Sequence, residues 1–346
     1  MNETTVSVYP DAEEKKYIRK RYSAAGLAVL VDLAVFQIVS RLFMLIVGAV
    51  SGAEGSISEI LRAGQTLIAS NDYTSVLFSI GFPIIAEVTA IIIAVKMLGL
   101  DLKSKFTREG YNLGEVAGGS AVGFFFQTVA VFIVMLLYFI VEGSTEGATD
   151  STIVQKSSLG ANIILYFYVC AFGPLLEELL FRGIILESMK MYSCRFAVVF
   201  SSVIFGLMHG NAAQAINGFL IGLVLGALYV RSDSLVPCTL MHMIMNTVTS
   251  VCSVLIYSDP NIIEKLTAGD ISALSGFPAA GVIINLLIRL LTFPAGLTVL
   301  IVAGTKGFGL MKANAAGKHR AAPLVLTTVT WIIVIVGYLA VIVYNF

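Results

Sequence analysis

Long apolar runs, separated by short polar segments, are the feature that most limits how this chain can fold. A helix needs about 20 apolar residues to cross the hydrocarbon core of a bilayer. Because the backbone of a spanning segment must satisfy its own hydrogen bonds, we predict an all-α, polytopic transmembrane helical bundle of eight or nine spans. The predicted spans lie near residues 23–50, 76–99, 116–141, 159–192, 195–211, 213–231, 235–257, 276–303 and 324–345.

The composition supports this class of protein. Hydrophobic residues make up 57% of the chain and charged residues 13%, whereas soluble proteins carry about 25% charged residues. Lys plus Arg and Asp plus Glu number 22 each. This balance gives no reason to expect a nucleic-acid partner.

The basic residues predict an orientation. With the N-terminus in the cytoplasm, 16 of the 22 Lys and Arg residues fall in or beside cytoplasmic segments, three fall outside and three lie within helices. Cytoplasmic loops are enriched in Lys and Arg. We therefore predict a multi-pass protein of the cell membrane whose N-terminus and 304–323 segment are cytoplasmic.

Three further patterns concern packing and the course of the chain. Gly218, Gly222 and Gly226 recur every four residues, which predicts close approach of a neighbouring helix. The external segment 51–75 is rich in Gly, Ser and Glu and is expected to hold a short surface helix. The span at 159–192 is long enough to be tilted, or broken at Gly173-Pro174.

Ionisable residues inside a bilayer are rare and indicate functional sites. The 159–192 span contains Glu177, Glu178 and Arg182. Glu178 and Arg182 stand four residues apart, on one helix face, where they can form an ion pair. Glu177 is rotated by about 100° from Glu178. We therefore predict that Glu178 is mainly structural and that Glu177 faces a cavity.

Two other spans carry the histidines of the membrane. Phe205-x-x-x-His209 ends the fifth span, and His242-x-x-x-Asn246 lies in the seventh. Counted from the cytoplasmic helix ends, His209, His242 and Glu177 lie roughly 21, 16 and 22 Å deep. This common depth predicts one buried site, in which His242 and Asn246 point into the same cavity.

These side chains allow two hydrolytic chemistries. In one, His209, His242 and Glu177 or Glu178 bind a divalent metal such as zinc and leave a position for water. In the other, Glu177 takes a proton from water while His242 and Asn246 stabilise the oxyanion. The residues alone leave both open.

The three motifs, in this order on three apolar segments, resemble those of the CAAX protease and bacteriocin-processing (CPBP, or Abi) family of intramembrane peptidases. The resemblance covers about residues 165–255 and extends to the type II CAAX prenyl endopeptidases, which have about eight spans. It implies that Glu177 activates water, that His209 and His242 complete the site, and that Asn246 holds the oxyanion. The motif positions also include Glu178, Arg182 and Phe205.

The resemblance implies a membrane-embedded peptide or protein substrate in the lipid bilayer and leaves the oligomeric state open. We divide the chain into a cytoplasmic N-terminal segment (1–22), N-terminal transmembrane helices (23–158), a catalytic helical core (159–257) and C-terminal transmembrane helices (258–346). Two other functions stay open: a non-catalytic membrane immunity or scaffold protein, and a transporter. The transporter lacks support from a second broken helix.

Other polar residues lie in predicted spans but outside the motifs. We expect Glu87 to pair with Arg41 or Arg289, or one of these arginines to contact a substrate carboxylate. The full set is Asp32, Arg41, Glu87, Gln127 and Arg289.

Overall fold

The protein is a bundle of helices. The computed structural model describes residues 12–107, 109–142, 158–191, 193–259, 261–305 and 328–344. These ranges contain helices, turns and loops but no β-strand, which confirms the predicted fold class. The predicted 304–323 segment lies outside the described residues except for its first two positions.

Each predicted span coincides with a described helix. Within the described ranges, seven helices are long and apolar enough to cross a membrane, and Cys194–Leu207 and Val329–Ile342 are shorter apolar helices. The protein is thus a multi-pass membrane protein. The spanning elements are α1 (Ala12–Val50), α3 (Asp72–Leu98), α4 (Leu113–Glu142), the continuous helix Leu159–Lys190, α8 (Cys194–Leu207), α9 (Ala212–Ser232), α10 (Leu235–Ile256), α12 (Gly276–Thr305) and α15 (Val329–Tyr344).

Short elements connect these helices. α2 (Ile57–Ala69) confirms the short helix predicted within 51–75, and a capping box between Ser56 and Glu59 starts it. The other short elements are η1 (Lys103–Lys105), α11 (Ile262–Thr267) and η5 (Ile271–Ala273).

The first helix is longer than predicted. α1 begins at Ala12 instead of residue 23, because the charged residues before the apolar run continue the helix. Its 39 residues correspond to about 58 Å, well beyond a hydrocarbon core of about 30 Å. Its N-terminal part therefore extends past the core.

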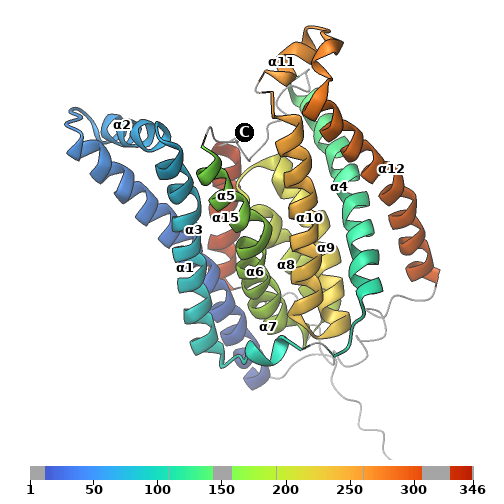
Figure 1. Ribbon diagram of the computed structural model, residues 1–346. Coiled ribbons are helices and arrows are strands. Elements are labelled where there is room, and N and C mark those ends of the chain that lie inside the picture. Colours follow the sequence, from blue (N-terminus) through green and yellow to red (C-terminus); the bar gives the residue numbers. More distant parts are fainter. Residues whose placement is uncertain are drawn as a thin grey trace, which may run out of the picture.

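The elements that carry the motifs occupy the middle of the bundle (Figure 1). α1, α2 and α3 lie on one side, and α4 and α12 on the other. The largest fully buried side chains include Trp331 of α15, Tyr229 of α9 and Arg182 of the Leu159–Lys190 helix. By contrast, large apolar side chains of α4 and α12, such as Phe139 and Leu290, are exposed, as expected for a surface that faces lipid.

Close packing of α8 on α9 depends on glycine. A Cβ added to Gly222 would lie 3.0 Å from Ser202 Cβ, and one added to Gly226 would lie 3.1 Å from Val198 Cγ1. On the α8 side, a Cβ on Gly206 would lie 2.4 Å from the Ala215 carbonyl oxygen. The glycine stripe therefore packs helices together, as predicted.

Charged side chains join the elements at the end of the bundle that holds η1 and the α9–α10 turn. Lys105 Nζ lies 3.2 Å from Glu187 Oε1 and 3.0 Å from Asp233 Oδ2. Lys190 also contacts Glu187 and Asp233. Burial disfavours the charged form of Asp233, but hydrogen bonds from Lys190 and Lys105 outweigh this and lower its pKa. The end of the Leu159–Lys190 helix is thereby fixed to the α9–α10 turn.

We expect Gly206→Ala to destabilise the protein, because the added methyl group meets backbone that cannot rotate away. Overpacking of this kind costs about 1–3 kcal/mol. Gly81→Ala is the matched control, since nothing lies within 4 Å of its added Cβ. Thermal unfolding of the two variants in detergent measures the difference. Equal melting temperatures would show that the α8–α9 contact tolerates a side chain.

Candidate active site

The helix that carries the first motif is continuous, so of the two alternatives, a tilted helix or one broken at Gly173-Pro174, the break does not occur. It runs through α5 (Leu159–Phe167), a π-helical turn (Tyr168–Phe172), α6 (Gly173–Glu178), a second π-helical stretch (Leu179–Leu186) and α7 (Glu187–Lys190). Proline has no N–H and disrupts a regular α-helix. The π-helical turn just before Pro174 accommodates it, because the hydrogen bonds there already follow a wider spacing.

Pro174 also explains the position of Asn246. The Gly173 N–H bonds to the Tyr168 carbonyl, five residues back. At the same spacing the Val169 carbonyl would need the N–H that Pro174 lacks. Asn246 Nδ2 donates to this carbonyl at 2.9 Å and so satisfies it. An amide nitrogen has two hydrogens, so the second remains available to another acceptor.

Glu178 and Arg182 form the predicted ion pair. Arg182 Nη1 lies 2.9 Å from Glu178 Oε1, and both side chains are fully buried. Arg182 Nη2 donates to the Gly222 carbonyl at 3.2 Å, and the guanidinium lies 4.6 Å from the centroid of the Phe205 ring. The arginine therefore joins the first motif to α9 and to the second motif.

His242 is held by the same carboxylate. Its Nδ1 lies 3.0 Å from Glu178 Oε1. An ionised carboxylate only accepts hydrogen bonds, so Nδ1–H donates to Glu178. The other ring nitrogen, Nε2, then faces Glu177 Oε2 at 3.6 Å. His242 is 5% exposed, and it lies behind Glu177 rather than on the cavity surface.

His209 lies just beyond the end of α8, at the turn into α9. Its Nδ1–H donates to the Phe205 carbonyl at 2.8 Å, and its ring stands edge-on to the Phe205 ring. This hydrogen bond leaves Nε2 as the free nitrogen. Gly218 makes room for the ring, since a Cβ there would lie 3.3 Å from His209 Nδ1.

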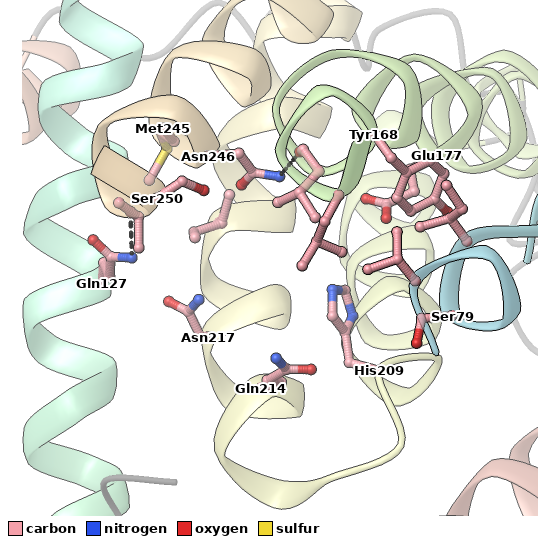
Figure 2. Close-up of a pocket in the computed structure, with 16 residues that line it drawn as sticks. Ser79, Gln127, Tyr168, Glu177, His209, Gln214, Asn217, Met245, Asn246 and Ser250 are labelled. Carbon is pink, nitrogen blue, oxygen red and sulfur yellow. Dashed lines mark hydrogen bonds between the residues drawn. The ribbon is translucent and has the colours of Figure 1, made fainter. Parts of the chain in front are cut away.

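Glu177, His209 and Asn246 meet at a cavity of about 540 Å³ between the helices (Figure 2). Glu177 keeps 18% of its side-chain surface exposed, whereas Glu178 keeps none. The structure therefore separates the two glutamates as predicted. It also separates His242 from Asn246, which the sequence placed in one cavity: Asn246 lines it and His242 does not.

Several lining residues were not predicted as site residues. Their signal in the sequence is polar side chains at helical spacing within apolar segments: Gln214 and Asn217 are three residues apart, and Thr249 and Ser250 follow Asn246 by three and four. The sequence distinguishes Gln127 only as a polar residue of a predicted span outside the motifs. The unpredicted polar lining residues are Ser79, Gln127, Tyr168, Gln214, Asn217, Thr249 and Ser250.

The described side chains form no metal site with three ligands. In the described part of the chain, no three His, Cys, Asp or Glu side chains are grouped closely enough to hold an ion. The Nδ1 atoms of both histidines bind Phe205 and Glu178, which leaves only their Nε2 atoms as possible metal ligands. The described side chains thus do not form the set of three ligands that a catalytic zinc ion requires.

The remaining polar residues of the spans have other partners. Arg289 donates to Thr128 Oγ1 and Asn285 Oδ1 rather than to Glu87, so that predicted pair is wrong. No ion pair of Arg41 with Glu87 occurs among the described residues. Asp32 hydrogen-bonds to Tyr338. Neither arginine lines the cavity.

Glu178→Ala is expected to lower folded yield, because it leaves the buried Arg182 charge without a partner. Breaking such a pair costs about 3–5 kcal/mol. Glu177→Gln removes no ion pair with Arg182 and should fold as the unmodified protein does. Size-exclusion chromatography and thermal unfolding compare the variants.

The control combines Glu178→Ala with Arg182→Met, which removes the unpaired charge and should recover part of the stability. Equal destabilisation by Glu177→Gln and Glu178→Ala would contradict the separation of structural and cavity-facing glutamates.

Residues 159–248, which contain all three motifs, match the family model for the type II CAAX prenyl endopeptidase Rce1-like proteins. The chain is also 34% identical over 76 residues to a Bacillus subtilis (strain 168) protein named "Putative membrane peptidase YdiL". This stretch is 22% of the present chain and 31% of that protein, so the match spans about a third of the relative. No solved structure matches the chain significantly. The resemblance seen in the motifs is confirmed, and residues 159–248 are similar to the Rce1-like family.

Proposed function

We propose that this protein is an intramembrane endopeptidase in which Glu177 activates water for hydrolysis of a peptide bond. The observation that carries the proposal is the convergence of Glu177, His209 and Asn246, from three segments of the bundle, on one cavity. Further support comes from the match of this segment to a family of membrane endopeptidases. The substrate is a membrane-associated or lipidated protein or peptide.

In the proposed reaction, Glu177 accepts a proton from water, and the resulting hydroxide attacks the carbonyl carbon of the scissile bond. His209, with Nε2 free, orients the same water. As the carbon–nitrogen bond breaks, Glu177 gives the proton to the nitrogen, which leaves as an amine. Water is thereby added across the peptide bond, and neither a cofactor nor a covalent intermediate is needed.

Asn246 and His242 have separate roles in this proposal. The second N–H of Asn246 donates to the oxyanion, while its first N–H stays on the Val169 carbonyl. His242, fixed by Glu178, stands behind Glu177 and positions its carboxylate. The oxyanion role that the sequence suggested for His242 therefore belongs to Asn246 alone.

We propose the glutamate mechanism in preference to zinc catalysis on the basis of donor geometry. In the described part of the chain, no three His, Cys, Asp or Glu side chains are close enough to hold an ion, and His242 Nε2 lies 3.6 Å from the Glu177 carboxylate. This arrangement suits proton transfer and orientation. An amide such as Asn246 is also a poor ligand for zinc beside imidazole and carboxylate groups.

The cleavage rates of two variants test these roles. Glu177→Gln should abolish cleavage, and Asn246→Ala should lower kcat by roughly 10²–10³-fold, the usual effect of losing one oxyanion donor. The assay follows cleavage of a fluorescent decapeptide that ends in a farnesylated Cys-Ala-Ala-X sequence, beside its unprenylated form. Ser79→Ala is the control: Ser79 lines the cavity, but its hydroxyl is bound to the Ser75 carbonyl.

Full activity of Glu177→Gln would refute the proposed base, and full activity of Asn246→Ala would remove that residue from the mechanism. A protein that binds both peptides and cleaves neither would instead fit the scaffold function.

We also propose that the end of the bundle containing η1 and α7 faces the cytoplasm. Lys105, Lys190 and Arg231 are near this end, whereas Arg62 of α2 and Lys265 of α11 are at the other (Figure 1). The enrichment of basic residues on the cytoplasmic side supports this orientation.

Cysteine labelling tests the orientation at two exposed positions. In intact cells, an impermeant maleimide should label Gln65→Cys of α2 and spare Lys103→Cys of η1 until the cells are lysed. The unmodified protein, with its own four cysteines, gives the background. Labelling of Lys103→Cys but not Gln65→Cys in intact cells would invert the topology.

A further inference from the structure

The cavity has a second polar wall, away from Glu177. In Figure 2, Glu177, Tyr168 and Ser79 lie on one side, Gln127, Asn217 and Ser250 on the other, and Asn246 between them. The second wall comes from three helices, because Gln127 belongs to α4, Asn217 to α9 and Ser250 to α10. None of these groups takes part in the proposed reaction.

Hydrogen-bonding capacity on this wall is not used within the protein. Asn217 Oδ1 and Ser250 Oγ are buried and have no described partner. Gln127 Nε2 makes one long hydrogen bond, 3.4 Å, to Thr249 Oγ1. Leaving buried polar atoms unpaired is costly. Because Asn217 and Ser250 line the cavity, their unpaired atoms point to a polar ligand in it.

The chemistry of the wall indicates what kind of ligand fits. Among the described residues, the charged or titratable side chains that line the cavity are Glu177, His209 and Tyr168, and no Lys or Arg is one of them. The second wall is neutral and offers both donors and acceptors. A peptide group has the same combination, one N–H donor and one C=O acceptor. A lipid chain would satisfy none of these atoms.

A protease inside a membrane has particular need of such a wall. A peptide must be unwound to be cleaved, and unwinding frees backbone N–H and C=O groups. Each such group costs several kcal/mol if it stays unsatisfied in an apolar environment. The cavity, at about 540 Å³, is within the range of roughly 300–1,000 Å³ common for ligand sites.

We propose that Asn217, with Gln127 across the cavity, binds the backbone of an extended substrate peptide beside the scissile bond. In this arrangement the Asn217 side chain, which lines the cavity, turns so that its enclosed Oδ1 accepts a peptide N–H. The inference rests on the proposed peptidase function and defines its substrate class as an unwound, uncharged peptide segment recognised through its main chain. Asn217 and Gln127 are specificity-determining residues, not catalytic ones.

The test uses binding, so that it does not depend on turnover. In the Glu177→Gln background, fluorescence anisotropy measures the Kd of the farnesylated decapeptide in detergent micelles. A second set of peptides carries one backbone N-methyl group at successive positions. Asn217→Leu is the variant, because Leu has nearly the same size and removes the buried, unpaired oxygen.

We expect Asn217→Leu to raise the Kd by roughly 3- to 10-fold, the effect of one neutral hydrogen bond, and not to lower the melting temperature. At one position of the peptide, an N-methyl group should raise the Kd for the Glu177→Gln protein by a similar factor. When Asn217→Leu is also present, the same N-methyl group should not raise the Kd further. In the catalytically competent protein, Asn217→Leu should raise KM and leave kcat unchanged. Ser79→Ala should change none of these values.

Unchanged binding by Asn217→Leu, or an N-methyl penalty that persists in this variant, would overturn the proposal. Asn217→Leu could instead lower the melting temperature and leave the ratio of affinities for the methylated and unmethylated peptides unchanged. This result would show a purely structural role for Asn217 and would also overturn the proposal. Failure of cleavage alongside the expected binding pattern would refute the peptidase function but not the backbone contact.

Discussion

The site depends on the fully buried ion pair between Glu178 and Arg182. Arg182 neutralises the carboxylate, binds the Gly222 carbonyl and lies against Phe205. The same Glu178 oxygen then accepts from His242. A single charge interaction thus joins the three motif segments. Since an unpaired charge at this depth costs several kcal/mol, the helices have one favourable register relative to one another.

Adjacent glutamates acquire different environments through helix geometry. A rotation of about 100° per residue directs Glu178 toward the packed interface and Glu177 toward the cavity. Proline contributes on the same helix: Pro174 leaves the Val169 carbonyl without its donor, and Asn246 bonds to that carbonyl from α10. Glycine completes the arrangement, because Gly206 and Gly218 bring α8 and α9 close enough to place His209.

Much of the fold and part of the site could be predicted from sequence. Apolar length gave the spans, and the spacing of four residues gave the Glu178–Arg182 pair, because both depend on local geometry alone. The continuity of the helix through Pro174 could not be predicted, since it depends on a π-helical turn and a hydrogen bond from another helix. The positions of His242 behind Glu177 and of Arg289 beside Thr128 depend on helix rotation, which hydrophobic periodicity does not fix when every face is apolar. Asn217 was missed because only its position on the cavity distinguishes it from other polar residues.

The central claim is that Glu177 and its neighbours hydrolyse a peptide bond without a catalytic metal. Its most direct test is the divalent metal content of purified protein, measured by mass spectrometry on a sample in which the active chains have been counted by stoichiometric binding of the farnesylated peptide. The account predicts far less than one metal ion per active chain and the same turnover after exhaustive treatment with a chelator. One zinc ion per active chain, lost and regained together with cleavage, would contradict it.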